Sequence, residues 1–230
     1  MKLFALLSAY IALFLVAAPA GAGEAPTSFP SLEQPVRTVL AVAELGPGTE
    51  LPQFSNCGRQ DGDVITICMD PPPFWIKATI LETVFGAALP PALYLSTTSH
   101  YGVRDYSNGA YLIAIKTDGK QFIMPKYAHL ELVRNKQGDL YFFLRSPHPA
   151  WWLPCNVSSL REEIDSRDFD HLQENAGVDV GTYSVTKFPE LFRVTGKRAV
   201  PRFGVAINRL REHLAMNAVQ AEELACNPAI

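Results

Sequence analysis

The chain has 230 residues, of which 48% are hydrophobic and 19% are charged, and it contains 18 prolines. A disordered chain would carry more charge and fewer apolar residues, and the scattered prolines and glycines form no collagen or coiled-coil repeat. The formal net charge is −3, from 20 basic and 23 acidic residues, so there is no excess of positive charge to attract nucleic acid. The composition therefore predicts an ordinary globular protein with no nucleic acid among its partners.

The N-terminus has the anatomy of a secretory signal peptide. A single lysine precedes the uncharged run Leu3–Val16, and Pro19 follows within a stretch of small residues. The apolar run is shorter than the about 20 residues that cross a bilayer, and Ala-x-Ala sites end at Ala20 and Ala22. We therefore expect residues 1–22 to be removed, with no stable membrane anchor left and a periplasmic or secreted location.

Four cysteines follow the expected cleavage sites, and none of them belongs to a Cys-x-x-Cys motif. An even number of cysteines in an exported chain favours disulfides over a metal-thiolate site. Three pairings are possible, and the order along the chain favours Cys57–Cys68 and Cys155–Cys226. In the chain-entropy model the shorter loop would gain roughly 3 kcal/mol from its bridge and the longer loop roughly 4 kcal/mol.

The pattern up to residue 145 predicts a β-rich body. Residues 23–35 hold three prolines and no periodicity, which is typical of a flexible leader. After them, β-branched or alternating runs recur between Gly, Pro and Asp turn signals, as in antiparallel barrels and sandwiches. We predict a hairpin between Cys57 and Cys68 and strands at Val36–Ala43, Phe74–Phe85, Ala92–Thr98, Gly109–Thr117, Gln121–Pro125, Leu130–Arg134 and Leu140–Leu144.

The remainder of the chain changes character. Ser159 and Glu162 have the spacing of a capping box, which predicts a helix that begins there. Residues 178–200 are predicted to be mixed, with short strand character at Thr182–Thr186 and Glu190–Val194, and a last helix from about Val205 carries an apolar face. The fold expected is thus α+β: an antiparallel barrel (OB-like) or sandwich over residues 36–145, then an α-rich, disulfide-stapled C-terminal extension over 146–230 that packs on it.

Catalytic and ligand-binding motifs are absent from the sequence. It contains no glycine-rich phosphate loop, no His-Glu-x-x-His and no Gly-x-Ser-x-Gly. The five histidines stand alone, without the paired spacing that metal ligation from one element requires. We therefore expect no cofactor and no metal, and the pattern favours a protein that is not an enzyme.

Two short segments supply the candidate binding residues, His100, Tyr101, Trp151 and Trp152. Ser99 and His100 are neighbours at the end of a predicted strand, where adjacent side chains point to opposite faces and so do not form a nucleophile-base pair. They are more typical of a strand end or a binding rim. Trp151 and Trp152 lie between prolines. Exposed tryptophans would anchor a partner or stack on a sugar, whereas buried ones would plug one end of the barrel.

The segment after Cys68 also resembles a known group of proteins. Three prolines, Pro71 to Pro73, follow this cysteine and lead into a strand with Ala78, Ile80, Val84 and Gly86. The stretch Trp75–Gly102 resembles the opening strands of secreted OB-type barrels related to netrin-like and metalloproteinase-inhibitor domains. That resemblance implies a barrel that binds protein or glycan partners. The inhibitors of that group bind the protease metal through an N-terminal cysteine, whereas this chain would begin near Gly23 after cleavage, so no site residue is carried over.

Together these features predict an exported, non-enzymatic binding protein with a protein or glycan partner in the cell envelope. An inhibitor, an immunity-type partner or an assembly accessory would fit this description. One alternative is a hydrolase with a distributed site around His100. Another is a structural component of the envelope, which buried tryptophans and the absence of an exposed apolar patch would favour.

Overall fold

The structure is a computed structural model that describes residues 29–51, 73–98, 106, 109–154, 156–170, 172 and 176–216, together with the backbone of 60–61 and 64–65. Several of the sequence predictions lie outside these residues: the signal peptide, both disulfides, His100 and Tyr101. In the part of the chain that is described, no helix is both long enough and apolar enough to cross a membrane.

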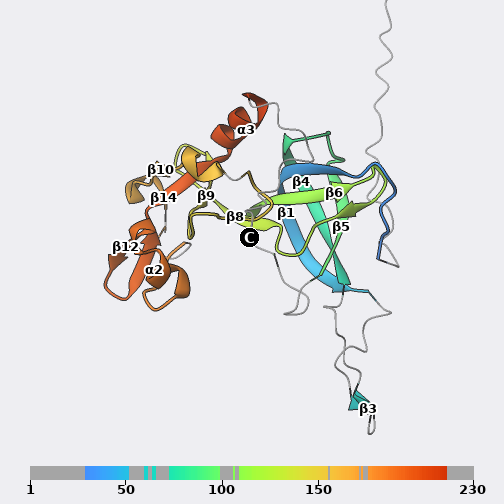
Figure 1. Ribbon diagram of the computed structural model, residues 1–230, viewed down its shortest axis with the longest axis horizontal. Coiled ribbons are helices and arrows are strands. Elements are labelled where there is room, and N and C mark those ends of the chain that lie inside the picture. Colours follow the sequence, from blue (N-terminus) through green and yellow to red (C-terminus); the bar gives the residue numbers. More distant parts are fainter. Residues whose placement is uncertain are drawn as a thin grey trace, which may run out of the picture.

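Five strands form a closed barrel, drawn in the right half of Figure 1. They run in the spatial order β1-β4-β5-β7-β6, and β6 pairs with β1 to close the ring. Every contact is antiparallel except the one between β5 and β7, where Ser96 lies opposite Ile123. The predicted α+β fold with a barrel is confirmed at this level, and closure distinguishes it from a sandwich. The strands are β1 (Arg37–Glu50), β4 (Pro73–Phe85), β5 (Ala92–Thr98), β6 (Ala110–Thr117) and β7 (Phe122–Ile123).

Strand β1 is longer than the sequence predicted. Turn residues at 46–48 indicated an end near Ala43, but pairing with β4 resumes after a register shift between Leu45 and Gly48. Pro47 lies in this irregularity, where its missing N–H removes no ladder hydrogen bond. The long, bent strand can therefore pair with β4 along one edge and with β6 along the other.

The barrel is filled by aliphatic side chains. The largest of them are almost completely shielded from solvent. Consecutive residues of β1 and β6 are buried, so both faces of these two strands are covered by other parts of the chain. This core also includes Trp152 and part of the C-terminal helix. Its fully buried members include Leu40, Ile76, Leu95, Leu112, Ile113 and Ile115.

Strand β6 divides the sheet. Its last residues pair with β7, which belongs to the barrel, whereas Ala110–Ile113 pair with β8 (His129–Arg134), which extends the sheet beyond the barrel. Beyond β8 the sheet continues through β9 (Leu140–Phe143), β14 (Phe203–Ala206) and β10 (Glu162–Glu163). The strands predicted at Leu130–Arg134 and Leu140–Leu144 are present and pair with each other as β8 and β9, and this part of the sheet joins the barrel to the C-terminal region (Figure 1).

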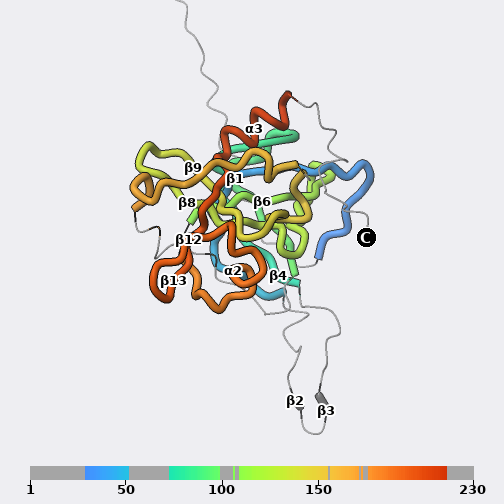
Figure 2. The backbone as a smooth tube through the Cα atoms, turned by 60° about the vertical axis from the view of Figure 1, so that its left-hand side comes forward, coloured from blue at the N-terminus to red at the C-terminus, as the bar shows by residue number. Residues whose placement is uncertain are grey.

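Residues 156–216 mix short strands with short helices. A second, three-stranded sheet has the order β11-β13-β12, and Figure 2 shows it with α2 on the side of β8 and β9. Helix α3 contacts β4, β9 and β14 and so spans the junction between the two parts. The bounds are β11 (Val178–Asp179), α2 (Tyr183–Lys187), β12 (Phe192–Thr195), β13 (Arg198–Pro201) and α3 (Ile207–Met216).

Two local predictions in this region are wrong. The capping box does not begin an α-helix: Val157–Leu160 is a 3-10 helix, and the Ser159 hydroxyl donates to the carbonyl of Asn156. Glu162 belongs to strand β10, because pairing with β14 and an ion pair with Arg209 outweigh a capping interaction of about 1 kcal/mol. The segment predicted to have strand character at 182–186 is helical as α2. The strand character predicted at Glu190–Val194 is present as β12, shifted to Phe192–Thr195. The main difference from prediction is that the described residues after Ser159 form 3-10 helices and a short strand in place of a helix.

The last predicted helix is confirmed over its described part. Helix α3 buries Ile207, Leu210 and Leu214, which have the spacing of one helix face. Among the N-terminal elements, β2 (Gln60–Asp61) and β3 (Val64–Ile65) form the predicted hairpin as a separate two-stranded sheet.

The chain enters the barrel along the β6–β7 turn. The backbone N–H of Glu33 donates to the Asp118 carboxylate, and the Glu33 side chain pairs with Lys120 at 3.3 Å. Asp118 also accepts the backbone N–H groups of Lys120 and Gln121. These backbone hydrogen bonds, with that of Glu33 the largest contribution, lower the pKa of Asp118 to about 2. The described end of the predicted leader is thus held against the barrel.

Candidate binding crevice

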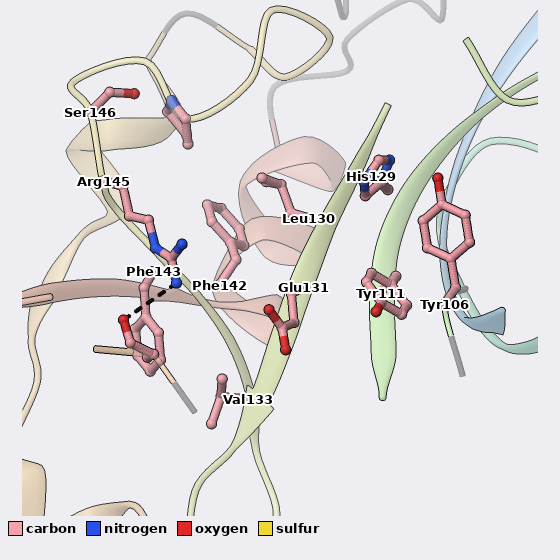
Figure 3. A pocket seen from close by; sticks show the side chains of 12 residues that line it. Tyr106, Tyr111, His129, Leu130, Glu131, Val133, Phe142, Phe143, Arg145 and Ser146 are labelled. Carbon is pink, nitrogen blue, oxygen red and sulfur yellow. Dashed lines mark hydrogen bonds between the residues drawn. The ribbon is translucent and has the colours of Figure 1, made fainter. Parts of the chain in front are cut away.

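A crevice of about 390 Å³ opens where the sheet leaves the barrel. Strands β6, β8 and β9 supply its floor, and its rim is supplied by the segment that follows β9, residues 144–154, which we call the connector (Figure 3). Because strand side chains alternate between faces, His129, Glu131 and Val133 of β8 share one face. Tyr111 of β6 lies directly opposite Glu131 in the ladder and so joins the same surface.

Aromatic side chains form one wall of the crevice. The rings of Tyr106, Tyr111 and His129 meet edge to face, with centroid separations of 5.7 Å, 5.2 Å and 6.2 Å. Such arrangements are favourable because a ring edge is positive and a ring face is negative. Tyr106 is buried. The three rings therefore pack on one another as a fixed wall.

The opposite side is apolar and is also held in place. Phe143 of β9 packs against Phe169 with a centroid separation of 5.5 Å and an interplanar angle of 69°. Tyr141, two residues earlier on β9, contacts the same ring at 5.3 Å. Burial, followed by a hydrogen bond with Glu162, raises the pKa of Tyr141 to about 12. Its hydroxyl thus stays protonated at neutral pH, and it helps to fix the strand from which Phe143 projects.

The rim is anchored at the far end of the connector. The Trp152 indole N–H donates to the carbonyl of Tyr127 at 3.2 Å, which ties the connector to the turn before β8. Tyr127 has a φ of 61°, a left-handed conformation that is uncommon outside glycine. Near the crevice, the Ser146 hydroxyl donates to the carbonyl of His148. The connector is therefore a shaped segment with fixed ends.

Two charged groups enter the crevice from different elements. The Glu131 side chain projects from β8, and the Arg145 guanidinium extends from the connector (Figure 3). Among the described residues, the Glu131 carboxylate has no hydrogen bond and no ion pair, and it is exposed. Arg145 makes one hydrogen bond, to the carbonyl of Ala176 at 3.3 Å. A guanidinium has five N–H donors, so both groups retain hydrogen-bonding capacity toward the crevice.

The structure separates the two tryptophans that the sequence placed together. Trp152 is 3% exposed and belongs to the main core, whereas Trp151 is 51% exposed. Only Trp151 is thus presented to solvent, and Trp152 acts through packing and its hydrogen bond to Tyr127. The other two candidates, His100 and Tyr101, lie outside the described residues. Within the described ranges, no group of three His, Cys, Asp or Glu side chains could hold a metal ion.

Sequence reasoning missed the crevice residues. Glu131 lies within a predicted strand and Arg145 follows another, and neither is among the candidate binding residues that the sequence predicts. They line the same crevice because β8 pairs with the part of β6 that β7 leaves unpaired, and because Arg145 follows the end of β9 by two residues. The one signal in the sequence is an acidic side chain within the apolar run of β8.

Comparison with other proteins does not assign the chain to a family. No family model matches the chain, and neither a curated protein nor a solved structure matches it. The functional reading therefore rests on the crevice itself, a fixed aromatic and apolar cleft that holds an acidic and a basic group.

Proposed function

We propose that this chain is an exported binding protein that engages a polypeptide partner in the cell envelope through the crevice. The observation that carries the proposal is the combination of a packed aromatic and apolar lining with Glu131 and Arg145, whose charged groups keep unused hydrogen-bonding capacity. Interfaces gain most of their affinity where a few partner side chains fill pockets that lose their water on binding. The signal-peptide pattern of the N-terminus supports export.

The lining favours a polypeptide over a glycan or a nucleic acid. The aromatic rings are engaged edge to face with each other, whereas sugar binding would use a ring face left open for stacking. The Glu131 carboxylate would repel the phosphates of a nucleic acid. A polypeptide can offer an apolar side chain, a cation and a carbonyl oxygen within one segment, which matches the three kinds of group in the crevice.

The barrel is proposed to be of the OB type. Its five strands follow a Greek-key order, with the third and fifth strands along the chain in parallel contact, which supports this assignment. Strands β4 and β5, which carry the resemblance to the netrin-like and inhibitor domains, are second and third in the barrel, whereas the resemblance matched them to opening strands. The proposal is therefore restricted to the barrel type and includes no inhibitor mechanism.

The predicted disulfides remain part of the proposal. In the β2–β3 hairpin, Gln60 lies opposite Ile65 and Asp61 lies opposite Val64. Moving three residues outward along both strands from the first pair leads to Cys57 and Cys68. A register that continued would bring these cysteines opposite each other, where cross-strand Cβ atoms approach bridging distance. Thiol labelling of the denatured, unreduced protein is expected to find no free thiol.

The proposed function is tested by capture of envelope proteins on the immobilised chain. Val133→Asp places a charge in the apolar part of the crevice, and we expect it to abolish capture of the proteins that the unmodified chain retains. Val194→Asp is the matched control, because Val194 is a strand valine that is 61% exposed and does not line the crevice. Equal capture by Val133→Asp and the unmodified chain, with both folded by circular dichroism, would reject the crevice as the binding site.

Trp151 is proposed as a second contact. It lies two residues after Pro149, which lines the crevice, and half of its surface is exposed. Trp151→Ala is expected to weaken capture without changing the fold, because no other described residue depends on this side chain for a hydrogen bond. Unchanged capture would remove Trp151 from the contact surface and leave the crevice as the proposed site.

A further inference from the structure

We propose that the crevice selects a segment of the partner that carries a lysine or arginine side chain, with Glu131 receiving the cation. This inference deepens the proposed function and rests on it. It names the chemistry of the partner at one position, and it follows from the surroundings of a single carboxylate.

The surroundings of Glu131 are suited to a cation. Its carboxylate lies in a cleft whose floor is otherwise apolar or aromatic, with Arg145 and Ser146 on the rim, and no described residue forms an ion pair with it. Carboxylates of strand β10, in contrast, are neutralised within the chain. Glu162 pairs with Arg209 at 3.0 Å, and Glu163 pairs with both Arg193 and Arg202. Although Glu131 is exposed, the low-dielectric walls of a cleft concentrate the field of an unpaired carboxylate, which attracts an incoming cation more strongly than one on an open surface.

The apolar lining matches the stem of a long basic side chain. Lysine and arginine carry three or four methylene groups that pack on apolar surface while the charged end remains hydrogen-bonded. Val133 follows Glu131 by two residues on the same face of β8, and Phe143 projects from the neighbouring strand. A stem that lies across these side chains would bring its charged end to the carboxylate.

Arg145 adds to the selectivity of the crevice because it would bind a different group of the partner, a backbone carbonyl oxygen. Its guanidinium would repel a second cation, and its unused N–H donors suit a carbonyl oxygen of the partner backbone. The bond to Ala176 holds the guanidinium at one side of the crevice. The two charges therefore impose a direction on the bound segment, with the cation toward β8 and a backbone oxygen toward the connector.

The inference is tested with two defined peptides and the full chain. One is an acetylated and amidated Gly-Leu-Lys-Leu-Gly pentapeptide, and the other has norleucine in place of lysine, which retains the aliphatic stem and lacks the ammonium group. Affinity and location are measured together by NMR titration of the 15N-labelled protein. We expect the lysine peptide to bind about fivefold more tightly, the order of a partly exposed ion pair of about 1 kcal/mol, and to shift the amides of β8 and β9.

Three variants identify the groups responsible. Glu131→Gln keeps the side-chain shape and is expected to equalise the affinities for the two peptides. Glu44→Gln is the matched control, an exposed strand glutamate away from the crevice that should leave the fivefold preference intact. Arg145→Gln should weaken both peptides by similar factors, because both offer the same backbone.

The inference is overturned by equal affinities on the unmodified protein, by a preference that persists in Glu131→Gln, by shifts that map away from β8 and β9, or by no binding of the lysine peptide. Its failure is distinguishable from failure of the proposed function. If Val133→Asp still abolishes capture of envelope proteins while the peptides show no preference for lysine, the crevice is the binding site and recognises other chemistry.

Discussion

The barrel and the C-terminal region are held together by different forces. Large aliphatic side chains such as Leu95 and Ile113 are fully enclosed in the barrel, in one continuous core. Helix α3 and a few neighbouring residues belong to this core, but the rest of residues 156–216 packs in two small clusters, around Phe169 and Phe192. Ion pairs such as Glu163 with Arg193 and Arg202 connect their strands. Buried apolar area stabilises in proportion to its size, whereas partly exposed ion pairs contribute little each.

The difference explains why the crevice lies at the border of the two regions. Inside the barrel the side chains are committed to packing, and in the C-terminal region most of the charged groups near β10 and β14 are committed to one another. Between them, β8 and the connector retain uncommitted charges over a fixed lining. A binding site requires such groups, because a ligand gains affinity only from contacts that the free protein has not already made.

The largest expected effect separates two neighbouring tryptophans. Trp152→Ala should lower the free energy of unfolding by about 3–5 kcal/mol, the usual cost of removing a large core aromatic, and it also removes the hydrogen bond to Tyr127. Trp151→Ala, in the exposed neighbour, should change it by about 0.5 kcal/mol or less. Urea denaturation of both variants measures the difference. Similar losses in the two would mean that the barrel core does not extend to the connector.

The next largest effect concerns a glycine at the end of β4. Gly86 has a φ of 91°, and an added Cβ would lie 2.9 Å from the Thr38 carbonyl oxygen, so both conformation and space require glycine. Gly86→Ala should cost about 2–4 kcal/mol, as the sum of the left-handed backbone and the overpacking terms. The β8–β9 turn supplies the control. Gly138 has a φ of 97° with no atom within 4 Å of the added Cβ, and Gly138→Ala should cost only about 1–2 kcal/mol. Equal losses of unfolding free energy at the two positions would show that the backbone around Thr38 shifts without cost to make room for the added methyl group.

Most barrel strands could be predicted from the sequence because their signals are local. The alternation in Phe74–Phe85 and the Asp-Gly turn at 118–119 each specify an element without help from the rest of the chain. The Gly-Pro-Gly at 46–48 misled the prediction because a bulge uses the same residues as a turn. In the C-terminal region the capping box of Ser159 was outweighed by strand pairing and ion pairs with residues about 40 positions away. No local pattern records such partners.

The candidate site was less predictable than the fold, for a related reason. Glu131 and Arg145 are 14 residues apart, and Tyr111 comes from another strand. They line one crevice because β1 occupies one edge of β6 when the barrel closes, so that β8 pairs with the other edge. The sequence does not show which strands occupy these edges. Trp151 and Trp152 were recognised as an unusual pair, but only the packing of the connector could tell which of the two is exposed.

A smaller effect should appear as local opening of the C-terminal region. Arg202 pairs with Glu163 and lies 5.2 Å from the centre of the Phe203 ring, so Arg202→Gln removes two weak contacts worth about 1 kcal/mol together. Hydrogen exchange should accelerate at the amides of β12 and β13 and remain unchanged at β1 and β4. Arg167→Gln is the control, because its partner Asp165 is only two residues away. Faster exchange throughout the barrel would show that the two regions unfold as one unit.

The smallest effect contrasts two carboxylates with the same lowered pKa. Asp118 beside the barrel and Asp165 in the C-terminal region both have a pKa near 2. Backbone hydrogen bonds, led by that of Glu33, lower the pKa of Asp118, whereas the Arg167 side chain is the main cause for Asp165. Because each pKa is lower in the folded chain than the ordinary 3.8, each group stabilises the fold above about pH 4 and loses this contribution as the pH falls toward 2.

Added salt should separate the two carboxylates. At 1 M salt the Debye length is about 3 Å, so the ion pair of Arg167 with Asp165 is weakened, whereas short backbone hydrogen bonds persist. We expect NMR titration in 1 M sodium chloride to raise the pKa of Asp165 part of the way toward 3.8, because its backbone hydrogen bond with Arg167 remains, and to leave that of Asp118 nearly unchanged. Arg167→Gln should reproduce the salt effect at Asp165 alone. Equal upward shifts of both groups would mean that Asp118 is also held by charge, through Lys120, and the contrast between a packed barrel and an ion-paired C-terminal region would not extend to their surfaces.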